Sequence, residues 1–166
     1  MLRKIIRKQN NSSRCIVCGD KNPFSLNGRF YELDNNELVG IFNVRDLHQS
    51  FPGRVHGGMI VAMLDETIGR AMWIEKPGSW AVTVELNVKY KKPIPTDTIL
   101  RAVGRITRDS RKIFEGTGEI LLENGDIAAE AWAKYIRVPI EHAADEDFVN
   151  NQWYYLEEDD PTEIEI

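Results

Sequence analysis

Residues 56–73 read HGGMIVAMLDETIGRAMW, and this stretch decides the fold. Apolar side chains recur around most of the circumference that a helix here would have. The pattern therefore predicts a helix from about Gly57 to Trp73 that is buried on several sides. Pro77 and Gly78 follow shortly afterwards and end it. A helix that is apolar nearly all round requires other elements of the chain to cover it.

The segments on both sides of this helix have the alternation of β-strands. Two strand-like runs precede it, at 28–33 and 37–44, and four follow it, at 82–90, 99–106, 113–122 and 127–138. In the run 82–90 the even positions are apolar and the odd positions polar, which predicts a half-buried strand with one apolar face. Polar turns separate the later runs and favour antiparallel pairing. The sequence thus predicts an α+β architecture in which a curved sheet wraps one helix.

Composition excludes several classes of protein. The net charge of −5 and the sequence pI of about 5.3 argue against a nucleic-acid-binding surface, which is usually basic. No run reaches the roughly 18 apolar residues that cross a bilayer, so no membrane segment is expected. Only two cysteines occur, which argues against a secreted domain built on disulfides and favours a cytoplasmic location.

The charges are concentrated at the two ends. Residues 1–14 carry five basic residues and no acid, whereas the chain from Glu141 onward carries ten acids and no Lys or Arg. We expect two solvated tails, at 1–14 and 139–166, on either side of a single domain at 15–138. A weaker alternative is that one tail pairs with the other in an oligomer.

The motif His56-Gly57-Gly58, with Asp65 nine residues after the histidine, resembles the signature of the hotdog-fold thioesterases. The likeness is greatest to the subgroup similar to the phenylacetate-pathway thioesterase. It extends over residues 15–138 through a CxxCGxxNP opening, a loop FPGxVHGG and a strand TVELNVxYxxP. This resemblance implies the hotdog fold, an antiparallel sheet wrapped around one long central helix. It also implies a homodimer or homotetramer that hydrolyses acyl-CoA thioesters.

Thioester hydrolysis needs an oxyanion donor and a group that activates water or attacks directly. The free N–H of Gly57 at the helix N-terminus is expected to be the donor, with Gly58 allowing substrate to approach closely. Asp65 is expected to act as general base or nucleophile, with a pKa raised by partial burial. Gly57 and Asp65 are eight residues apart, about 12 Å of helix rise. One helix cannot bring both to one carbon, so we expect an active site at a dimer interface.

Neighbouring residues are expected to support this pair. His56 would hold the glycine loop by hydrogen bonding, and Thr83 would contact the attacking water or the carboxylate. Glu66 is the alternative to Asp65, but it points about 100° away on the helix and is otherwise a salt-bridge partner.

Other residues are expected to contact substrate. Relatives often place an amide side chain at the position of Ser50, and Gln49 is the nearest amide here. A basic turn between two strands is expected to meet the CoA phosphates; its members are Arg108, Ser110, Arg111 and Lys112.

Cys15 and Cys18 have the spacing of zinc ligands, but a tetrahedral site needs four. A redox pair is a second possibility, and we favour a third, a turn-stabilising role with buried thiols. No metal or organic cofactor is expected. Two other functions stay open: a non-catalytic acyl-CoA-binding or sensor module, and a dehydratase or hydratase of acyl thioesters that uses His56 with Asp65.

Overall fold

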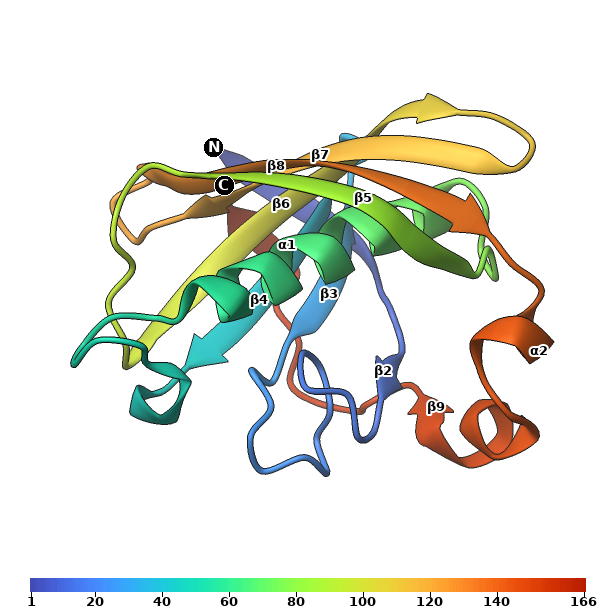
Figure 1. The fold of residues 1–166 in the computed structure, drawn as a ribbon, viewed down its shortest axis with the longest axis horizontal. Coiled ribbons are helices and arrows are strands. Elements are labelled where there is room, and N and C mark those ends of the chain that lie inside the picture. The colour runs from blue at the N-terminus through green and yellow to red at the C-terminus, as the bar shows by residue number, and fades with distance from the viewer.

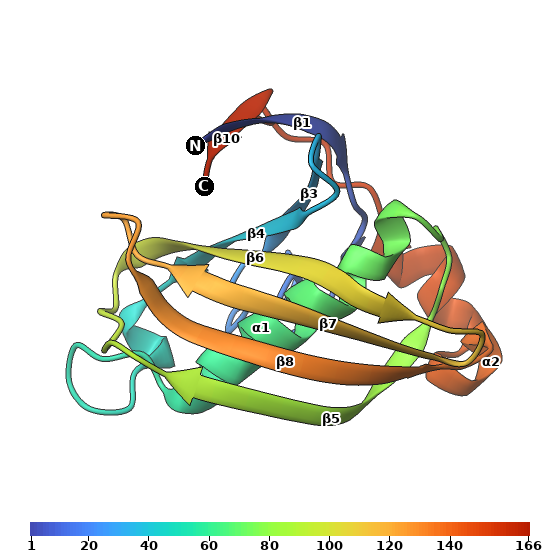
Figure 2. The same ribbon diagram turned by 90° about the horizontal axis from the view of Figure 1, so that it is seen from above.

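The computed structural model describes residues 1–166, which fold around one long helix, α1 (Gly57–Ala71). Eight antiparallel strands form a single sheet in the order β10-β1-β3-β4-β6-β7-β8-β5. The sheet curves around α1, so that the helix lies in its concave face (Figures 1 and 2). The strands are β1 (Leu2–Lys8), β3 (Arg29–Leu33), β4 (Leu38–Val44), β5 (Ala81–Tyr90), β6 (Thr98–Asp109), β7 (Ile113–Leu121), β8 (Ile127–Arg137) and β10 (Glu163–Glu165).

Smaller elements complete the chain. Two short strands pair with each other, β2 (Asn11–Ser12) and β9 (Trp153–Tyr154). Single helical turns are η1 (Asp46–His48), η2 (Met72–Ile74), α2 (Ile140–Ala143) and η3 (Phe148–Gln152). None of the helices combines the length and the apolar character of a membrane-spanning segment.

The predicted helix and the α+β architecture are confirmed. Helix α1 begins at Gly57 and continues through η2, so the helical run ends within a residue of the predicted boundary. All six predicted strands are present as β3 to β8. Their periodicity explains this agreement, because strands β4 to β8 each have one face against the helix.

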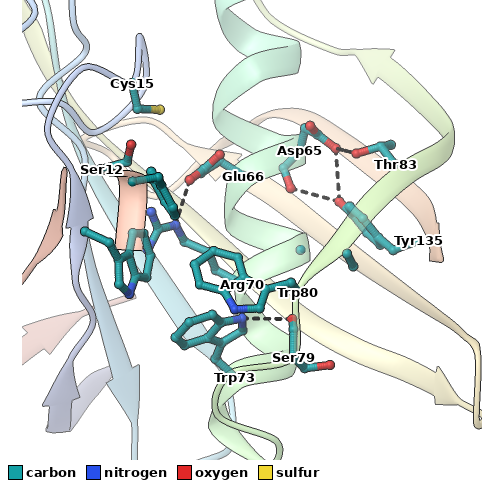
Figure 3. Close-up of a pocket in the computed structure, with 14 residues that line it drawn as sticks. Ser12, Cys15, Asp65, Glu66, Arg70, Trp73, Ser79, Trp80, Thr83 and Tyr135 are labelled. Carbon is teal, nitrogen blue, oxygen red and sulfur yellow. Dashed lines mark hydrogen bonds and ion pairs between the residues drawn. The ribbon is translucent and has the colours of Figure 1, made fainter. Parts of the chain in front are cut away.

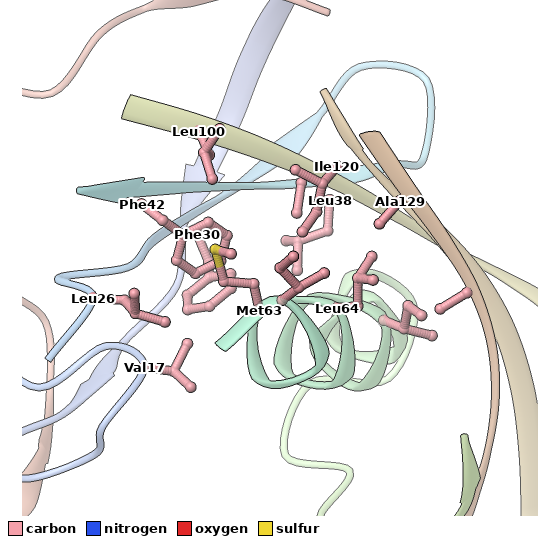
Figure 4. Close-up of a cluster of buried hydrophobic side chains, with 14 of the residues drawn as sticks. Val17, Leu26, Phe30, Leu38, Phe42, Met63, Leu64, Leu100, Ile120 and Ala129 are labelled. Carbon is pink, nitrogen blue, oxygen red and sulfur yellow. The ribbon is translucent and has the colours of Figure 1, made fainter. Parts of the chain in front are cut away.

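The core lies between α1 and the sheet, and α1 is buried on most of its surface, as predicted. Met63 and Leu64 are fully buried between α1 and the sheet (Figure 4), and Ile68 is fully buried in the same core. Each such side chain stabilises the fold by roughly 1.5–3 kcal/mol relative to an exposed one. Glycines in the sheet let the helix approach closely. A Cβ atom at Gly104 would lie 2.8 Å from the Thr67 carbonyl oxygen.

The expectation of two solvated tails was wrong. Residues 2–8 form β1, which pairs with β3 and also with β10 at the C-terminus, so the two ends lie side by side (Figure 2). The Lys8 side chain is buried, and its ammonium lies 2.9 Å from Glu158 and 2.7 Å from Asp160. The oppositely charged ends therefore pair with each other within one chain. The weaker alternative had expected such a pairing between the chains of an oligomer.

Strand β5 departs from the predicted alternation because it contains a β-bulge. Thr83 pairs with Tyr135 and Glu85 pairs with the preceding residue of β8, Lys134, so Val84 is an extra residue. The bulge reverses which side chains face α1. Val82 and Val84 are consequently 42% and 54% exposed, whereas Thr83 turns toward the helix. The predicted apolar face was wrong for this end of the strand.

Candidate active site

Asp65 lies in the middle of α1, and residues of the sheet hold its carboxylate in place. Its Oδ1 atom accepts a hydrogen bond of 2.7 Å from the Thr83 hydroxyl and lies 3.3 Å from the Tyr135 hydroxyl (Figure 3). The Tyr135 hydroxyl also lies 2.8 Å from the Asp65 carbonyl oxygen. The second carboxylate oxygen, Oδ2, has no partner in the chain. One oxygen is thus fixed, and the other is free for chemistry.

The sheet brings these groups together through one cross-strand row. Thr83 pairs with Tyr135, and Tyr135 pairs with Phe114 on β7. The Phe114 and Tyr135 rings stack with centroids 4.9 Å apart. Without the bulge at Val84, Thr83 would project away from the helix with the polar face of β5. The bulge is therefore what places the Thr83 hydroxyl against Asp65.

The environment of Asp65 favours a carboxyl group that takes up protons more readily than usual. Burial raises the pKa of Asp65, and the negative charge of Glu66 adds to this effect. The hydrogen bonds from Thr83 and Tyr135 stabilise the ionised form and lower the pKa in opposition. Burial is the larger influence, so Asp65 is a stronger base than an exposed aspartate.

A pocket of about 290 Å³ opens beside Asp65. One part of its wall comes from α1, β5 and β8. Another part comes from the segment that contains Ser12 and Cys15 and from the C-terminal segment (Figure 3). The lining residues are Ser12, Cys15, Asp65, Glu66, Gly69, Arg70, Trp73, Ser79, Trp80, Ala81, Thr83, Tyr135, Phe148 and Trp153.

Four aromatic rings form the apolar end of this pocket. Trp73 and Trp80 have centroids 5.0 Å apart, and Trp153 lies 5.4 Å from the first and 5.2 Å from the second. Phe148 packs 5.6 Å from Trp80. Because Phe148 and Trp153 belong to the C-terminal segment, the docked end of the chain completes the pocket wall.

The N-terminus of α1 carries the other predicted groups. The expected hydrogen bond between His56 and the glycine loop is present. The Gly58 N–H donates it to the His56 Nδ1 atom over a distance of 2.8 Å. A Cβ atom at Gly58 would lie 3.0 Å from that Nδ1, so glycine leaves room for the cap. The Gly57 N–H has no acceptor in the chain, and the Gly57 carbonyl accepts 3.2 Å from the Tyr90 hydroxyl.

Gln49 and Ser50 lie in the exposed loop before α1 and away from the Asp65 pocket. Gln49 accepts a 3.3 Å hydrogen bond from the Gly53 N–H, and the Ser50 N–H donates to the Arg54 carbonyl. These residues therefore belong with the helix N-terminus. Within one chain the structure separates that group from the group around Asp65.

Glu66 points away from Asp65, toward Cys15 and Arg70 (Figure 3). Its carboxylate pairs with the Arg70 guanidinium at 2.8 Å, four residues along the helix. The Arg70 guanidinium is buried and also donates 2.8 Å to the Asn10 carbonyl. Glu66 is thus a salt-bridge partner, the role that we expected for it if it did not replace Asp65.

The basic turn connects β6 to β7 and is exposed. Arg108 lies 3.5 Å from Glu115, and the Ser110 hydroxyl bonds to the Ile113 carbonyl at 2.7 Å. Arg111 and Lys112 have no acidic partner in the chain. The turn is next to the site, because Phe114 follows it and pairs with Tyr135.

Sequence reasoning missed Tyr135, Phe148 and Trp153. A signal for Tyr135 was available, because it continues a series of inward-facing alanines on β8, and a hydroxyl on such a face needs a partner. Trp153 also had a signal, because aromatic residues inside an acidic tail indicate that the tail docks on its own domain or on a partner subunit. Nothing in the sequence marked Phe148 or connected either residue with the pocket.

Comparisons with known proteins point to one family of enzymes. Residues 52–129 match the family model described as the thioesterase superfamily. Acyl-coenzyme A thioesterase THEM4 of Mus musculus is 32% identical over 111 residues, which are 66% of this chain and 46% of that protein. The chain thus spans about half the length of the curated relatives it matches.

Two solved structures share the fold. A phenylacetic acid degradation-related protein from Ralstonia eutropha JMP134 is 26% identical, with a TM-score of 0.61 over 67% of this chain and 85% of that one. A Bacillus halodurans protein solved with CoA is 26% identical, with a TM-score of 0.59 over 66% of this chain and 73% of that one. Residues 52–129 thus resemble the thioesterase superfamily, and the chain has the hotdog fold.

Proposed function

We propose that this protein hydrolyses acyl-CoA thioesters, with Asp65 as general base or nucleophile. The observation that carries the proposal is the state of the Asp65 carboxylate. Its Oδ1 is fixed by Thr83, while its Oδ2 is unpaired beside a pocket. The similarity to acyl-coenzyme A thioesterase THEM4 and to a protein solved with CoA supports the choice of substrate.

The chemistry follows from two places on α1, Asp65 in its middle and Gly57 at its N-terminus. Oδ2 of Asp65 removes a proton from water, or attacks the thioester carbonyl itself. The oxyanion that develops needs a fixed N–H donor, and the Gly57 N–H is free at a helix N-terminus, where the helix dipole also favours negative charge. Collapse of the tetrahedral intermediate then expels the CoA thiolate, which takes up a proton. Where Asp65 itself has attacked, water then hydrolyses the resulting mixed anhydride and frees the carboxylate. The chain's own residues supply each of these steps without a metal or organic cofactor.

Both groups must reach one carbon atom, which requires two chains. Strand β5 offers a ten-residue edge with no strand on its outer side. The Tyr90 end of β5 contacts Gly57, and the Thr83 end contacts Asp65. Two β5 edges paired antiparallel about an axis near Leu86 would set Thr83 opposite Tyr90 of the second copy. That register carries Gly57 of one subunit to Asp65 of the other, in two equivalent sites.

The pocket and the basic turn would bind different parts of the substrate. The acyl group would enter the cavity beside Asp65 and contact the rings of Trp73, Trp80 and Trp153. The CoA phosphates would meet Arg111 and Lys112, which are exposed and free of acidic partners. A cytoplasmic location belongs to the same proposal, because both cysteines are free thiols. Cell fractionation tests the location.

The decisive experiment measures CoA release from short, medium, long and aromatic acyl-CoAs, using wild type and Asp65→Asn in parallel. The substitution is nearly isosteric, so folding and oligomer size should persist while hydrolysis is lost. Asp97→Asn is a matched control, because Asp97 is exposed and remote from the pocket. Acyl-CoA binding without any hydrolysis by wild type would instead support the binding module, and an enoyl product would support the dehydratase.

The shared site has its own test. Gly57→Pro removes the proposed donor N–H, and Asp65→Asn removes the base. Each variant alone should be inactive. After subunit exchange, a mixture should recover about a quarter of wild-type activity, since half of the dimers are mixed and each has one intact site. No recovery after proven exchange would contradict the two-chain site.

A further inference from the structure

Cys15 and Cys18 form a side-chain cluster that the proposed hydrolysis does not use. The two residues are joined by one turn, in which the Gly19 N–H donates 2.9 Å to the Cys15 carbonyl. Their sulfur atoms and a Glu66 carboxylate oxygen all lie within 4.8 Å of one another. Cα atoms three residues apart in such a turn are commonly within about 7 Å, the span that a disulfide bridges.

The favoured expectation of two buried thiols holds for only one of them. Cys18 is fully buried, whereas Cys15 is half-buried and lines the pocket that contains Asp65. The two cysteines therefore differ in access. A reagent in the pocket can react with the Cys15 sulfur. Cys18 can then react only with the modified Cys15, because it is buried.

Hydrogen-bond donors converge on both sulfurs. The Val17 N–H lies 3.2 Å from the Cys15 sulfur, and the Ser12 N–H lies 3.4 Å from the Cys18 sulfur. The Arg70 guanidinium also donates to the Cys18 sulfur at 3.3 Å. Donors of this kind stabilise a thiolate.

Arg70 also argues against a bound metal ion at this cluster. Its guanidinium contacts both the Glu66 carboxylate and the Cys18 sulfur, and it is itself buried between the rings of Phe30 and Trp153. It already supplies the positive charge that a cation would bring. Thiol chemistry fits the arrangement better than coordination.

One thiolate is shared between the two sulfurs. The hydrogen bond from Cys18 lowers the pKa of Cys15 to about 7, although burial and the charge of Glu66 oppose this. The same bond raises the pKa of Cys18, and burial adds to the effect, while Arg70 lowers it. Cys15 is thus the attacking sulfur at neutral pH. Cys18 becomes the better nucleophile once Cys15 no longer accepts its proton.

We propose that Cys15 and Cys18 are a reversible redox pair that reacts with small-molecule disulfides and changes the wall of the Asp65 pocket. In the first step the Cys15 thiolate attacks one sulfur of the disulfide, forming a mixed disulfide and releasing one thiolate, which takes up a proton. In the second step Cys18 loses its proton and attacks the Cys15 sulfur, which closes the internal bond and expels the second thiol. The pair gives up two electrons and two protons, and the disulfide gains them as two thiols.

Oxidation should reach the substrate pocket through Cys15 itself. Closing the bond moves the Cys15 sulfur toward Cys18 and removes the thiolate beside Glu66, whose carboxylate also pairs with Arg70. Cys15, Glu66 and Arg70 all line the pocket. This link to turnover rests on the proposed function, whereas the thiol chemistry does not depend on it.

The test equilibrates purified protein with glutathione at increasing ratios of oxidised to reduced form, followed by acid quenching, alkylation and intact mass measurement. The chain has only two cysteines, so the mass is unambiguous. Wild type should pass from two free thiols to none, with the loss of two hydrogens and no attached glutathione. Cys18→Ser should retain one glutathione on Cys15, and Cys15→Ser should stay reduced because Cys18 is buried.

Three outcomes would overturn the redox pair. They are two thiols retained by wild type under strongly oxidising conditions, equal reactivity of the two single variants, and stoichiometric zinc whose removal is required before either thiol reacts. Circular dichroism of both variants checks that they fold. Acyl-CoA hydrolysis, followed by chromatography of CoA, should fall on oxidation of wild type and return on reduction. Unchanged turnover of the oxidised enzyme would overturn the link to the pocket, and an inactive reduced enzyme would count only against the proposed function.

Discussion

Replacing Thr83 with valine should move the acidic limb of the pH–rate profile to higher pH. The variant keeps the β-branched shape and loses the hydroxyl that donates 2.7 Å to Oδ1 of Asp65. That hydrogen bond lowers the pKa of Asp65 against the effect of burial. Without it, the carboxyl group stays protonated to a higher pH. Because the proposed mechanism needs the carboxylate, activity should be lost earlier as the pH falls.

The magnitude follows from the strength of a hydrogen bond to a charged group, about 1.5–3 kcal/mol when buried. Thr83 is exposed and Tyr135 remains near the same oxygen, so the lower end, about 1.5 kcal/mol, applies. This is roughly a tenfold change in an equilibrium constant. On the acidic limb kcat/KM should therefore fall by up to about tenfold relative to wild type. On the alkaline plateau, where both proteins are ionised, the difference should be much smaller.

The assay measures kcat/KM for one acyl-CoA from acidic to mildly alkaline pH. Thr117→Val is a matched control, because Thr117 lies on a regular part of β7 opposite Trp132 and makes no side-chain hydrogen bond. Glu66→Gln should move the limb the opposite way, since the charge of Glu66 raises the pKa of Asp65. An equal loss at every pH in Thr83→Val, with no movement of the limb, would refute the reasoning.

Four further outcomes are expected. Because burial raises the pKa of Asp65 above its unfolded value, the ionised carboxylate destabilises the fold above the folded pKa and ceases to do so below the unfolded pKa. Asp65→Asn should therefore raise Tm at neutral pH but not in acid, and equal Tm differences at both would contradict this. Tyr135→Phe removes the hydroxyl bond to the Asp65 carbonyl and should cost about 1–2 kcal/mol in urea unfolding, with a lower kcat and little change in KM. Trp153→Ala opens the aromatic wall and should improve kcat/KM for bulkier acyl groups relative to small ones; Trp132→Ala, outside that pocket, should leave the ratio unchanged. Dialysis against EDTA should leave hydrolysis intact, and activity restored only by added metal would show that a cation takes part.

The helix and the six central strands could be predicted because each has a strong periodicity imposed by burial against one core. Asp65 and Thr83 were also identified, from a motif and a strand pattern. The contact between them could not be derived from the alternation in β5. That alternation places Thr83 on the outer face, and one extra residue, Val84, reverses it. A bulge depends on the partner strand, whose pairing a local pattern does not reveal.

The ends of the chain were harder to predict for a different reason. Their charges are typical of solvated segments, yet a few specific contacts dock them. Lys8 meets Glu158 and Asp160, and Trp153 meets the rings at the end of α1. Lys8 and Glu158 are 150 residues apart in sequence, and Trp153 is also far along the chain from Trp73, so only the folded chain brings these partners together.

The two edges of the sheet differ in what they offer to another chain. The outer strand at one edge, β10, has three residues, carries Glu163 and Glu165, and ends beside the C-terminus. The other edge, β5, is long and open. The proposed two-fold pairing through β5 would use the only long edge of each copy, so growth would stop at that contact. An open-ended filament would need β5 of one chain to add to β10 of the next, and a short, acidic strand is a poor template for it. The chain can thus have one unpaired edge strand that is open to dimer formation without a second edge that would allow open-ended polymerisation.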